Sequence, residues 1–422
     1  MALHWQIFIA LVAAFALGAG LGPEFAGIPL LALYEFVGGL FLDALKMLIV
    51  PLVMASIISG MANLGQGARV GRIAGRTASY FLVSTGLAVA TALILMNLLH
   101  PGITTGQPLS QQMALPDLGA GLNAKFAQHQ LSDFLQTIRD LIPANVIAAA
   151  ANTQMLGLIT FSLLFGFALT RVADPGRETV VRFWAGVQDV MILITHWVMR
   201  LAPIGVFALV AGVIAKTGLA LIVPMLGFFL VVIIGLIIHA TLNLSVLLWA
   251  ATRLNPLAMM RAVWPALLVA FSTSSSAGTL PVSLDVVENR ARVSKPIASF
   301  VLPLGATVNM NGTALYECAA VLFIAQAYGV DLSLGTQLMI VVLALLTSIG
   351  VAAVPSASLV AIALILGVLG LPLEAMGLLL IVDRLLDMFR TAVNVYSDTV
   401  AAVIVAHLGG ERGLLEPAPP PP

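Results

Sequence analysis

The chain has 422 residues, of which 60% are hydrophobic and 9% are charged, and its formal net charge is zero. A soluble domain carries about 25% charged residues, so the composition excludes a soluble globular protein and indicates an integral membrane protein with several spans. The single cysteine, Cys318, excludes a disulfide framework within the chain. The balanced charge says little about partners, and we expect no nucleic acid among them.

The apolar segments predict the membrane spans. We expect eight spanning helices, at roughly residues 5–35, 37–63, 77–100, 133–172, 184–214, 219–251, 297–327 and 374–407. The N-terminus lacks the strongly basic start of a cleaved signal peptide, so we expect the first span to be kept in the mature protein. Two further apolar stretches, 257–291 and 333–369, are interrupted by small residues and proline.

The positions of lysine and arginine predict the orientation. Basic residues gather in the segments 69–76, 171–182, 253–261 and 290–295 and at 412. By contrast, the polar segment 101–130 has one basic residue, and 296–383 has none. The positive-inside rule therefore places the basic loops and both termini in the cytoplasm. Because eight spans fit this arrangement better than ten, we interpret the two interrupted stretches as re-entrant hairpins, the first entering from the cytoplasm and the second from outside.

An internal repeat supports the two hairpins. The first contains TSSSAGTLP, Thr273 to Pro281, and the second contains TSIGVAAVP, Thr347 to Pro355. In both, Thr-Ser is followed by five residues, then Leu or Val, then Pro. Repeated broken segments in two halves of a chain indicate a transporter binding site. The alternative is a chance similarity between small-residue packing motifs of membrane helices.

The seventh predicted span is rich in groups that bend a helix or offer oxygen atoms. Gly305 and Gly312 allow the backbone to bend, and Asn309, Asn311 and Thr313 carry side-chain oxygens. A kinked span with free carbonyl groups can coordinate a hard cation such as sodium. The alternative is a glycine-hinged helix whose amides only form hydrogen bonds.

The last predicted span carries more charge than a passive anchor needs. A charge near the bilayer centre costs roughly a few kcal/mol unless it is paired or faces an aqueous cavity. Helical spacing places one set of polar residues on a single broad face: Asp387, Arg390, Thr391, Asn394 and Asp398. Arg390 suits a carboxylate and Asp387 suits an ammonium group, which together with hairpin backbone amides describes an acidic amino acid. The alternative is that these two side chains only neutralise each other at i,i+3.

Four motifs connect the chain to a known family. They are LKMLIVPLV from Leu45, SSSAGTLP from Ser274, NMNGTA from Asn309, and DMFRTAVN from Asp387 with Asp398 after it. On these motifs the chain resembles the dicarboxylate/amino-acid:cation symporter family, which includes archaeal aspartate transporters and animal excitatory amino-acid transporters. The resemblance covers almost the whole chain and implies an all-α integral membrane protein of the elevator type, with eight spans and two hairpins related as inverted repeats.

The resemblance also implies how the chain is divided. Residues 1–72 and 131–216 would form the scaffold of a homotrimer, and residues 73–100 and 217–410 would form a mobile transport domain. Within that domain, the second hairpin would be the outer gate. The segment 101–130 would be an extracellular loop, and the proline-rich tail, 411–422, would be disordered.

The resemblance implies a role for particular residues. Arg390 would bind the side-chain carboxylate of the substrate, and Asp387 would bind its α-ammonium group. The rest of the substrate site would be Ser275, Ser276, Thr313, Thr391 and Asn394, with backbone from Val354 and Ser358. One sodium site would use Asp398 with the backbone of Gly305, Asn309 and Asn394. Another would use Thr307, Met310 and the carbonyls of Ser348, Ile349 and Val351.

The chain departs from the family pattern at the ion sites. A third sodium site of the family has a carboxylate where this chain has Asn311 and a tyrosine where it has Phe81, although Ser84, Thr85 and Asn309 are kept. Glu317 matches an acid of the proton-coupled animal members, and burial favours the protonated form that a proton carrier needs. Together, Asn311 and Glu317 indicate an altered stoichiometry that involves protons.

Arginine positions differ as well. Many members carry an arginine at the position of Ser274 or Met388, and this chain has none at either. Its Arg384 lies elsewhere, and we expect it to pair near Asp383.

The sequence therefore predicts a multi-pass inner (plasma) membrane symporter of L-glutamate or L-aspartate, with sodium ions, protons or both as coupling ions and no other cofactor. A proton-only symporter of the same substrates is one alternative. A C4-dicarboxylate symporter is another, although such members keep the arginine at 390 and lack the aspartate at 387. An ion channel predicts a substrate-independent current, and a membrane enzyme fits worst because the polar residues suit binding better than bond-breaking.

Overall fold

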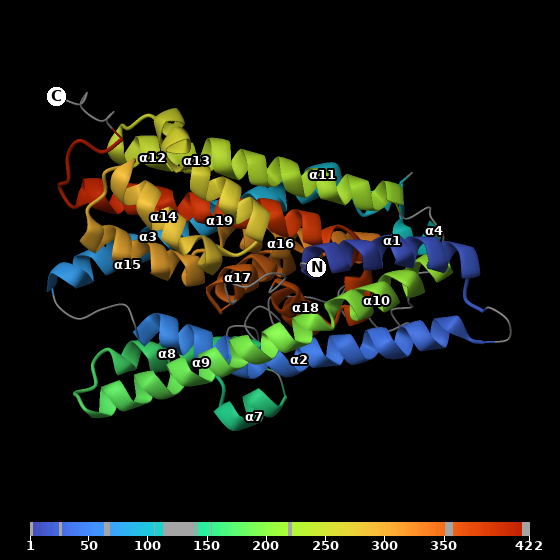
Figure 1. Ribbon diagram of the computed structural model, residues 1–422. Coiled ribbons are helices and arrows are strands. Elements are labelled where there is room, and N and C mark those ends of the chain that lie inside the picture. The colour runs from blue at the N-terminus through green and yellow to red at the C-terminus, as the bar shows by residue number, and fades with distance from the viewer. Residues whose placement is uncertain are drawn as a thin grey trace.

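The computed structural model describes residues 3–24, 28–62, 68–104, 106–112, 139, 142–152, 154–217, 222–350 and 358–415. These residues are mostly helical. The strands described, β1 (Ile103–Thr104) and β2 (Gln107–Pro108), form one short antiparallel ladder. Figure 1 shows long helices running largely side by side, with α2, α8 and α9 in one layer and α11 to α13 at the opposite side of the molecule.

The N-terminal half supplies the helices of this first layer and several helices outside it. Its helices are α1 (Leu3–Leu21), α2 (Leu30–Ala62), α3 (Ala68–Leu99), α4 (Leu109–Gln112), α7 (Val146–Ala151), α8 (Met155–Leu169), α9 (Gly176–Arg200) and α10 (Ala202–Thr217). α2 packs against α8, α9 and α10, and α1 packs against α10. The approach of α10 to α2 depends on Gly205, where an added Cβ would lie 2.2 Å from Cγ of Phe41.

Several predicted boundaries in this half are wrong. The break between the first two spans falls after Leu21, where Gly22 has φ of +66°, and not near residue 36. The predicted fourth span contains two helices, α7 and α8, and its residues 133–138 lie outside the described part of the chain. The predicted fifth span is divided at Leu201, just before Pro203, into α9 and α10. Proline lacks the N–H that a continuous helix needs, so a new helix starts there.

The C-terminal half surrounds one central helix. Its elements are α11 (Ile222–Ile238), the π-helical turn η2 (His239–Asn243), α12 (Leu244–Thr252), α13 (Pro256–Thr273), α14 (Ser276–Asn289), α15 (Lys295–Val308), α16 (Asn311–Ala327), α17 (Leu334–Gly350), α18 (Ser358–Leu369), the 3₁₀ turn η3 (Leu373–Ala375) and α19 (Met376–Leu408). α19 is a continuous helix of 33 residues that packs against α10, α11 and each of α12 to α16. The predicted last span is therefore confirmed as a helix buried within the protein.

The first hairpin is confirmed as helix–turn–helix. α13 ends at Thr273, and Ser274 adopts a left-handed conformation with φ of 51°. The chain then re-enters α14, whose first turn is capped because the Gly278 N–H donates to Oγ of Ser275 at 3.1 Å. In the second hairpin, α17 and α18 are present, but the turn between them, 351–357, lies outside the described residues.

The seventh span is broken where the sequence predicts a bend. α15 ends at Val308, and Asn309 and Met310 have non-helical backbones, with ψ of 65° and 63°. The backbone groups at such a break are tolerated at membrane depth only where protein or a cavity satisfies them.

Among the described residues, four helical stretches are long and apolar enough to cross a membrane. They are Arg72–Leu99, Val223–Thr252, Pro256–Thr273 and Lys295–Ala327. The all-α membrane fold agrees with the sequence, whereas the total of eight spans and the elevator arrangement stay predictions.

Candidate functional site

Arg390 lies at the centre of a buried ion cluster on α19. Its side chain is completely buried, and its Nη2 donates to Asp387 Oδ1 at 2.9 Å and to Asp383 Oδ1 at 3.1 Å. The guanidinium carbon lies 3.9 Å from the ring centroid of Tyr316, a cation–π contact that adds to its stabilisation. The predicted i,i+3 pair is thus present, and Asp383 joins it although no role in the site was predicted for this residue.

Arg390 still has donors to spare. Its Nε and Nη1 are buried, and neither has a hydrogen-bond partner among the described residues. A buried donor without a partner costs free energy of folding, and the cost is larger when the donor is charged. A carboxylate offers the acceptors that would satisfy these nitrogens, since guanidinium groups bind carboxylates through several parallel N–H bonds.

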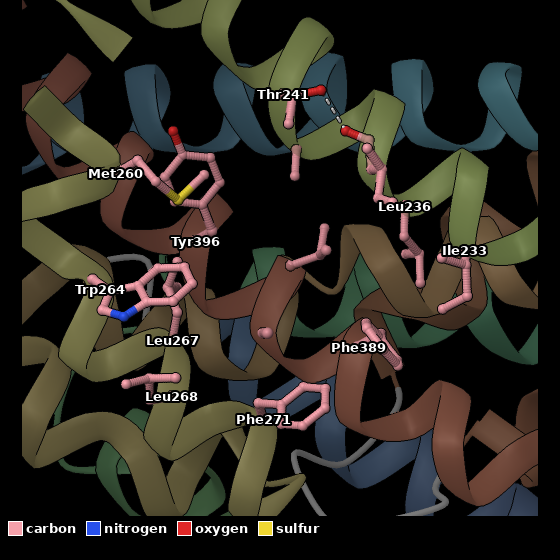
Figure 2. A pocket seen from close by; sticks show the side chains of 14 residues that line it. Ile233, Leu236, Thr241, Met260, Trp264, Leu267, Leu268, Phe271, Phe389 and Tyr396 are labelled. Carbon is pink, nitrogen blue, oxygen red and sulfur yellow. Dashed lines mark hydrogen bonds between the residues drawn. The ribbon is translucent and has the colours of Figure 1, made fainter. Parts of the chain in front are cut away.

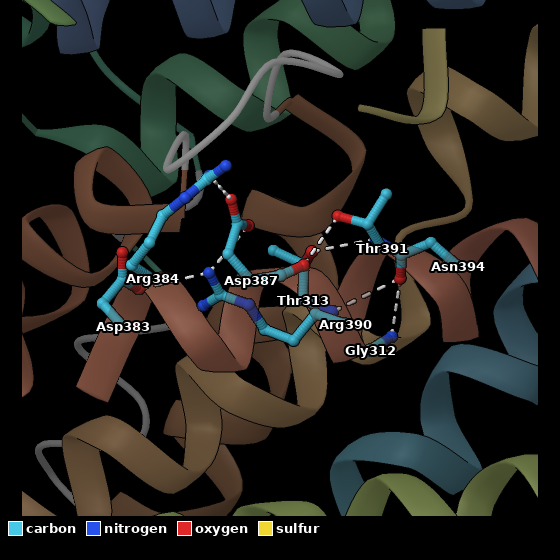
Figure 3. A network of polar contacts seen from close by, with 8 residues as sticks. All are labelled: Gly312, Thr313, Asp383, Arg384, Asp387, Arg390, Thr391 and Asn394. Carbon is cyan, nitrogen blue, oxygen red and sulfur yellow. Dashed lines mark hydrogen bonds and ion pairs between the residues drawn. The ribbon is translucent and has the colours of Figure 1, made fainter. Parts of the chain in front are cut away.

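Asn394 ties α19 to the start of α16. Its Oδ1 accepts from the N–H of Gly312 at 2.8 Å and of Thr313 at 3.4 Å, and its Nδ2 donates to Thr313 Oγ1 at 3.1 Å (Figure 3). Gly312 is needed there because an added Cβ would lie 2.8 Å from the carbonyl oxygen of Arg390. Beside it, Thr391 donates to the Asp387 carbonyl at 2.8 Å. Five of the predicted substrate residues therefore lie close together.

Four of the predicted substrate residues belong to the two hairpins. α13 meets α19 through an edge-to-face contact of Phe271 with Phe389, whose ring centroids are 5.0 Å apart. Ser275 caps α14, as described above, and Ser276 is buried. In the second hairpin, Ser358 is buried at the start of α18 and its Oγ has no partner. Val354 lies outside the described residues.

An apolar cavity of about 390 Å³ lies on the other side of the Phe271–Phe389 contact, between α11, α13 and α19 (Figure 2). Its lining includes Trp264, Leu267 and Tyr396 together with these two phenylalanines. The charged groups of the α19 cluster are not among its lining residues, so it is separate from the polar site.

Asp398 forms a second buried centre, which matches the first predicted sodium site. It is 3% exposed, and its Oδ1 accepts from Nδ2 of Asn309 at 2.8 Å. A Cβ at Gly305 would lie 2.4 Å from that same oxygen, so only glycine lets the α15 backbone approach the carboxylate this closely. A buried carboxylate beside a broken helix offers the oxygen ligands that a hard cation prefers.

The second predicted sodium site is described in part. Thr307 donates to the Leu304 carbonyl at 3.0 Å, Met310 is buried at the break, and Ser348 is buried near the end of α17. α15 and α17 are in contact with each other. The side chain of Ile349 and all of Val351 lie outside the described residues.

The third predicted site is a closed polar network. Ser84 donates to Asn309 Oδ1 and Thr85 donates to Asn311 Oδ1, each at 3.4 Å. Nδ2 of Asn311 donates to Ser397 Oγ at 2.9 Å and lies 3.3 Å from Nε2 of His239. The oxygens that would suit a cation are present, and the carboxylate joined to this network is that of Asp398, which accepts from Asn309. Asn311 itself adds no formal counter-charge for a cation.

Two residues of this network, His239 and Ser397, were not predicted from the sequence. His239 is completely buried and begins the π-helical turn η2, a distortion that is often found at functional sites. An ionisable residue inside a predicted span is a functional signal in itself, and could have identified His239. Tyr80, next to the substituted Phe81, places its hydroxyl 3.3 Å from Ser397 Oγ.

Glu317 links the broken helix to the second hairpin. The carboxyl group is completely buried, and its Oε2 accepts from Oγ1 of Thr347 at 2.7 Å. Its Oε1 has no hydrogen-bond partner. A buried carboxyl group with one acceptor unused and no ion pair among the described contacts is suited to carry a proton.

The motifs and this geometry agree with a comparison against known families. A model of the sodium:dicarboxylate symporter family matches residues 3–408. The chain belongs to this family. Family membership and the apolar helices together make it a multi-pass membrane protein.

Relatives of known function extend over nearly the whole chain. The proton/sodium-glutamate symport protein of Geobacillus stearothermophilus is 32% identical, over 97% of this chain and 95% of its own length. The proton/glutamate-aspartate symporter of Escherichia coli is 34% identical, over 96% and 92%. Excitatory amino acid transporter 2 of the mouse is 34% identical, over 89% of this chain and 73% of its own length. These relatives are transporters and not enzymes.

Proposed function

We propose that this family member is a secondary active symporter that carries glutamate or aspartate, driven by sodium ions, protons or both. The observation that carries the proposal is Arg390, a fully buried guanidinium with two unpartnered nitrogens, placed one helical turn from Asp387. These charges complement a carboxylate and an ammonium group held close together. The relatives named as glutamate and glutamate-aspartate symporters point to the same substrates.

The other substrate contacts follow from position. Thr313, Thr391 and Asn394 would offer hydroxyl and amide groups to the substrate backbone. Ser275 and Ser276 would approach from the first hairpin, and the backbone of Val354 and Ser358 from the second.

Coupling would depend on Asp398 and Glu317. When sodium is bound it supplies a positive charge that the buried Asp398 carboxylate and the Gly305 and Asn309 backbone can hold. Thr307, Met310 and Ser348 would hold a second sodium ion beside the hairpin. Glu317 would carry a proton, and its hydrogen bond to Thr347 would couple the protonation state of the carboxyl group to the position of the gate hairpin.

The transport cycle would be an elevator movement within a homotrimer. α1, α2 and α8 to α10 pack with one another, which fits a scaffold of residues 1–72 and 131–216. The broken helices, the first hairpin and α19 pack with one another, which fits a carrier of residues 73–100 and 217–410. The charge bias of the loops favours an inner (plasma) membrane protein with both termini in the cytoplasm.

The test is uptake into proteoliposomes that contain the purified protein. We expect radiolabelled glutamate or aspartate to accumulate against its gradient when sodium or a pH gradient is imposed. Uptake that persists without sodium would favour the proton-only alternative, and preferential uptake of succinate would favour the C4-dicarboxylate alternative. A steady current without substrate accumulation would contradict symport and favour a channel.

A further inference from the structure

Arg384 forms an ion pair inside the candidate substrate site. Its Nη1 lies 3.2 Å from Asp387 Oδ2, and the side chains of the two residues are 13% and 11% exposed. The sequence predicts a partner near Asp383, but adjacent residues of a helix point in different directions, whereas residues three apart share a face. Arg384 therefore reaches Asp387.

The carboxylate of Asp387 consequently lies between two guanidinium groups. Its Oδ1 accepts from Arg390 at 2.9 Å, and its Oδ2 pairs with Arg384 at 3.2 Å. Figure 3 shows the two arginines approaching this carboxylate from different sides. An ammonium group that binds Asp387 must therefore compete with an arginine that is already there.

Arg384 is the arginine that can leave. Arg390 is held by Asp383, by Asp387 and by the face of the Tyr316 ring, and it is completely buried. The ion pair of Arg384 with Asp387 is longer than that of Arg390 with the same carboxylate, and the Arg384 side chain is partly exposed. Its buried Nε has no hydrogen-bond partner among the described residues. Breaking the weaker pair costs less because water can reach part of it.

We infer that Arg384 is a specificity-determining residue that occupies the ammonium position on Asp387 until an amino group replaces it. This inference rests on the proposed function. The α-ammonium of an acidic amino acid takes over Asp387 Oδ2 and releases Arg384. A C4-dicarboxylate has no ammonium group, so Arg384 stays on Asp387 and keeps it neutralised while the second carboxylate binds nearby.

An acidic amino acid and a dicarboxylate require different amounts of positive charge from the site. The side chains of Asp383, Arg384, Asp387 and Arg390 sum to zero. An acidic amino acid adds one net negative charge, whereas a dicarboxylate adds two. Removing the positive charge of Arg384 therefore disfavours the dicarboxylate more than the amino acid, which brings its own cation to Asp387.

The experiment measures competition against aspartate uptake into proteoliposomes, with unlabelled aspartate and succinate as the two competitors. The readout is the ratio of the succinate concentration to the aspartate concentration that halves uptake. For Arg384→Gln and Arg384→Met we expect this ratio to rise about tenfold or more, and for Arg384→Lys to stay within about threefold of the unmodified protein. The control is Arg182→Gln, which removes a different arginine–carboxylate pair, with Glu178 and exposed on α9, and should leave the ratio unchanged.

Two results would overturn the inference. One is a concentration ratio that stays unchanged in both Arg384→Gln and Arg384→Met, or that rises just as much in the control Arg182→Gln. The other is an unmodified protein on which succinate does not compete at all. Failure of the proposed function looks different, because the unmodified protein would then accumulate neither glutamate nor aspartate.

Discussion

Thr347 donates a 2.7 Å hydrogen bond to Oε2 of Glu317, and this contact joins the second hairpin to the helix that follows the break in the seventh span. Both side chains are buried. Since the other oxygen of Glu317 has no partner, the carboxyl group can gain a proton without breaking the bond to the hairpin. A proton on Glu317 would therefore lie at the contact with the hairpin that we propose as the gate.

Replacing Glu317 with glutamine should separate proton coupling from transport. Glutamine can still accept from Thr347 through its amide oxygen, but it cannot exchange a proton. We expect Glu317→Gln to lower uptake driven by an imposed pH gradient by about tenfold or more, while sodium-driven uptake is kept. Proteoliposome uptake under each gradient measures this, with Glu374→Gln, at an exposed position, as the control. Full proton-driven uptake by Glu317→Gln would assign the proton to another group.

Gly305→Ala tests the sodium site at Asp398. The new Cβ would lie 2.4 Å from Asp398 Oδ1, so the carboxylate or the α15 backbone must move. We expect the stabilisation by sodium, read as the rise of the thermal unfolding midpoint across a sodium series, to be lost. Gly86→Ala is the matched control, because no atom lies within 4 Å of its added Cβ. Alanine in that helix should be neutral or stabilise by up to about 1 kcal/mol. A normal sodium response in Gly305→Ala would refute the assignment.

Asn311→Asp tests the third site. The amide oxygen of Asn311 already faces the hydroxyl of Thr85 at 3.4 Å, so a carboxylate there adds the missing negative charge without moving the chain. We expect tighter sodium binding, by about tenfold, and a steeper dependence of uptake on sodium concentration. Asn152→Asp, on an exposed turn, is the control. An unchanged sodium response would mean that the His239 and Ser397 contacts keep the network closed to cations.

Local sequence features predicted the irregular parts of this fold better than the regular ones. Glycine and asparagine around residue 309 indicated the break between α15 and α16, and the serines near 274 indicated the hairpin turn. The boundary at Leu21 was misplaced because Gly22, Pro23 and Glu24 are only a short interruption within a long apolar stretch.

The residues of the candidate site that were most readily predicted carry a charge within a membrane helix, and those that were missed join the site only through contacts made in the folded protein. Arg390, Asp387 and Asp398 could be recognised because an ionisable group in a membrane helix is costly and therefore indicates a functional site. The role of Asp383 depends on the reach of Arg390 over seven positions, which is seen only in the structure. His239 meets Asn311 because a π-helical turn rotates the chain, and spacing along the sequence does not reveal that turn.

Arg390→Lys tests the carboxylate-binding role while keeping the charge that Asp383 and Asp387 need. Removing the charge entirely would take from the buried Asp383 carboxylate its described ion pair and leave Asp387 with Arg384 alone, a loss of about 3–5 kcal/mol that threatens folding. Lysine avoids this, but its single ammonium head cannot replace the planar fork or the unpartnered Nε and Nη1 donors. We therefore expect the affinity for glutamate and aspartate to fall about tenfold to a hundredfold with the protein still folded. Uptake competition measures the affinity, and the thermal midpoint measures the folding. Arg200→Lys, at the exposed end of α9, is the control. Normal affinity in Arg390→Lys would show that the substrate carboxylate is bound elsewhere.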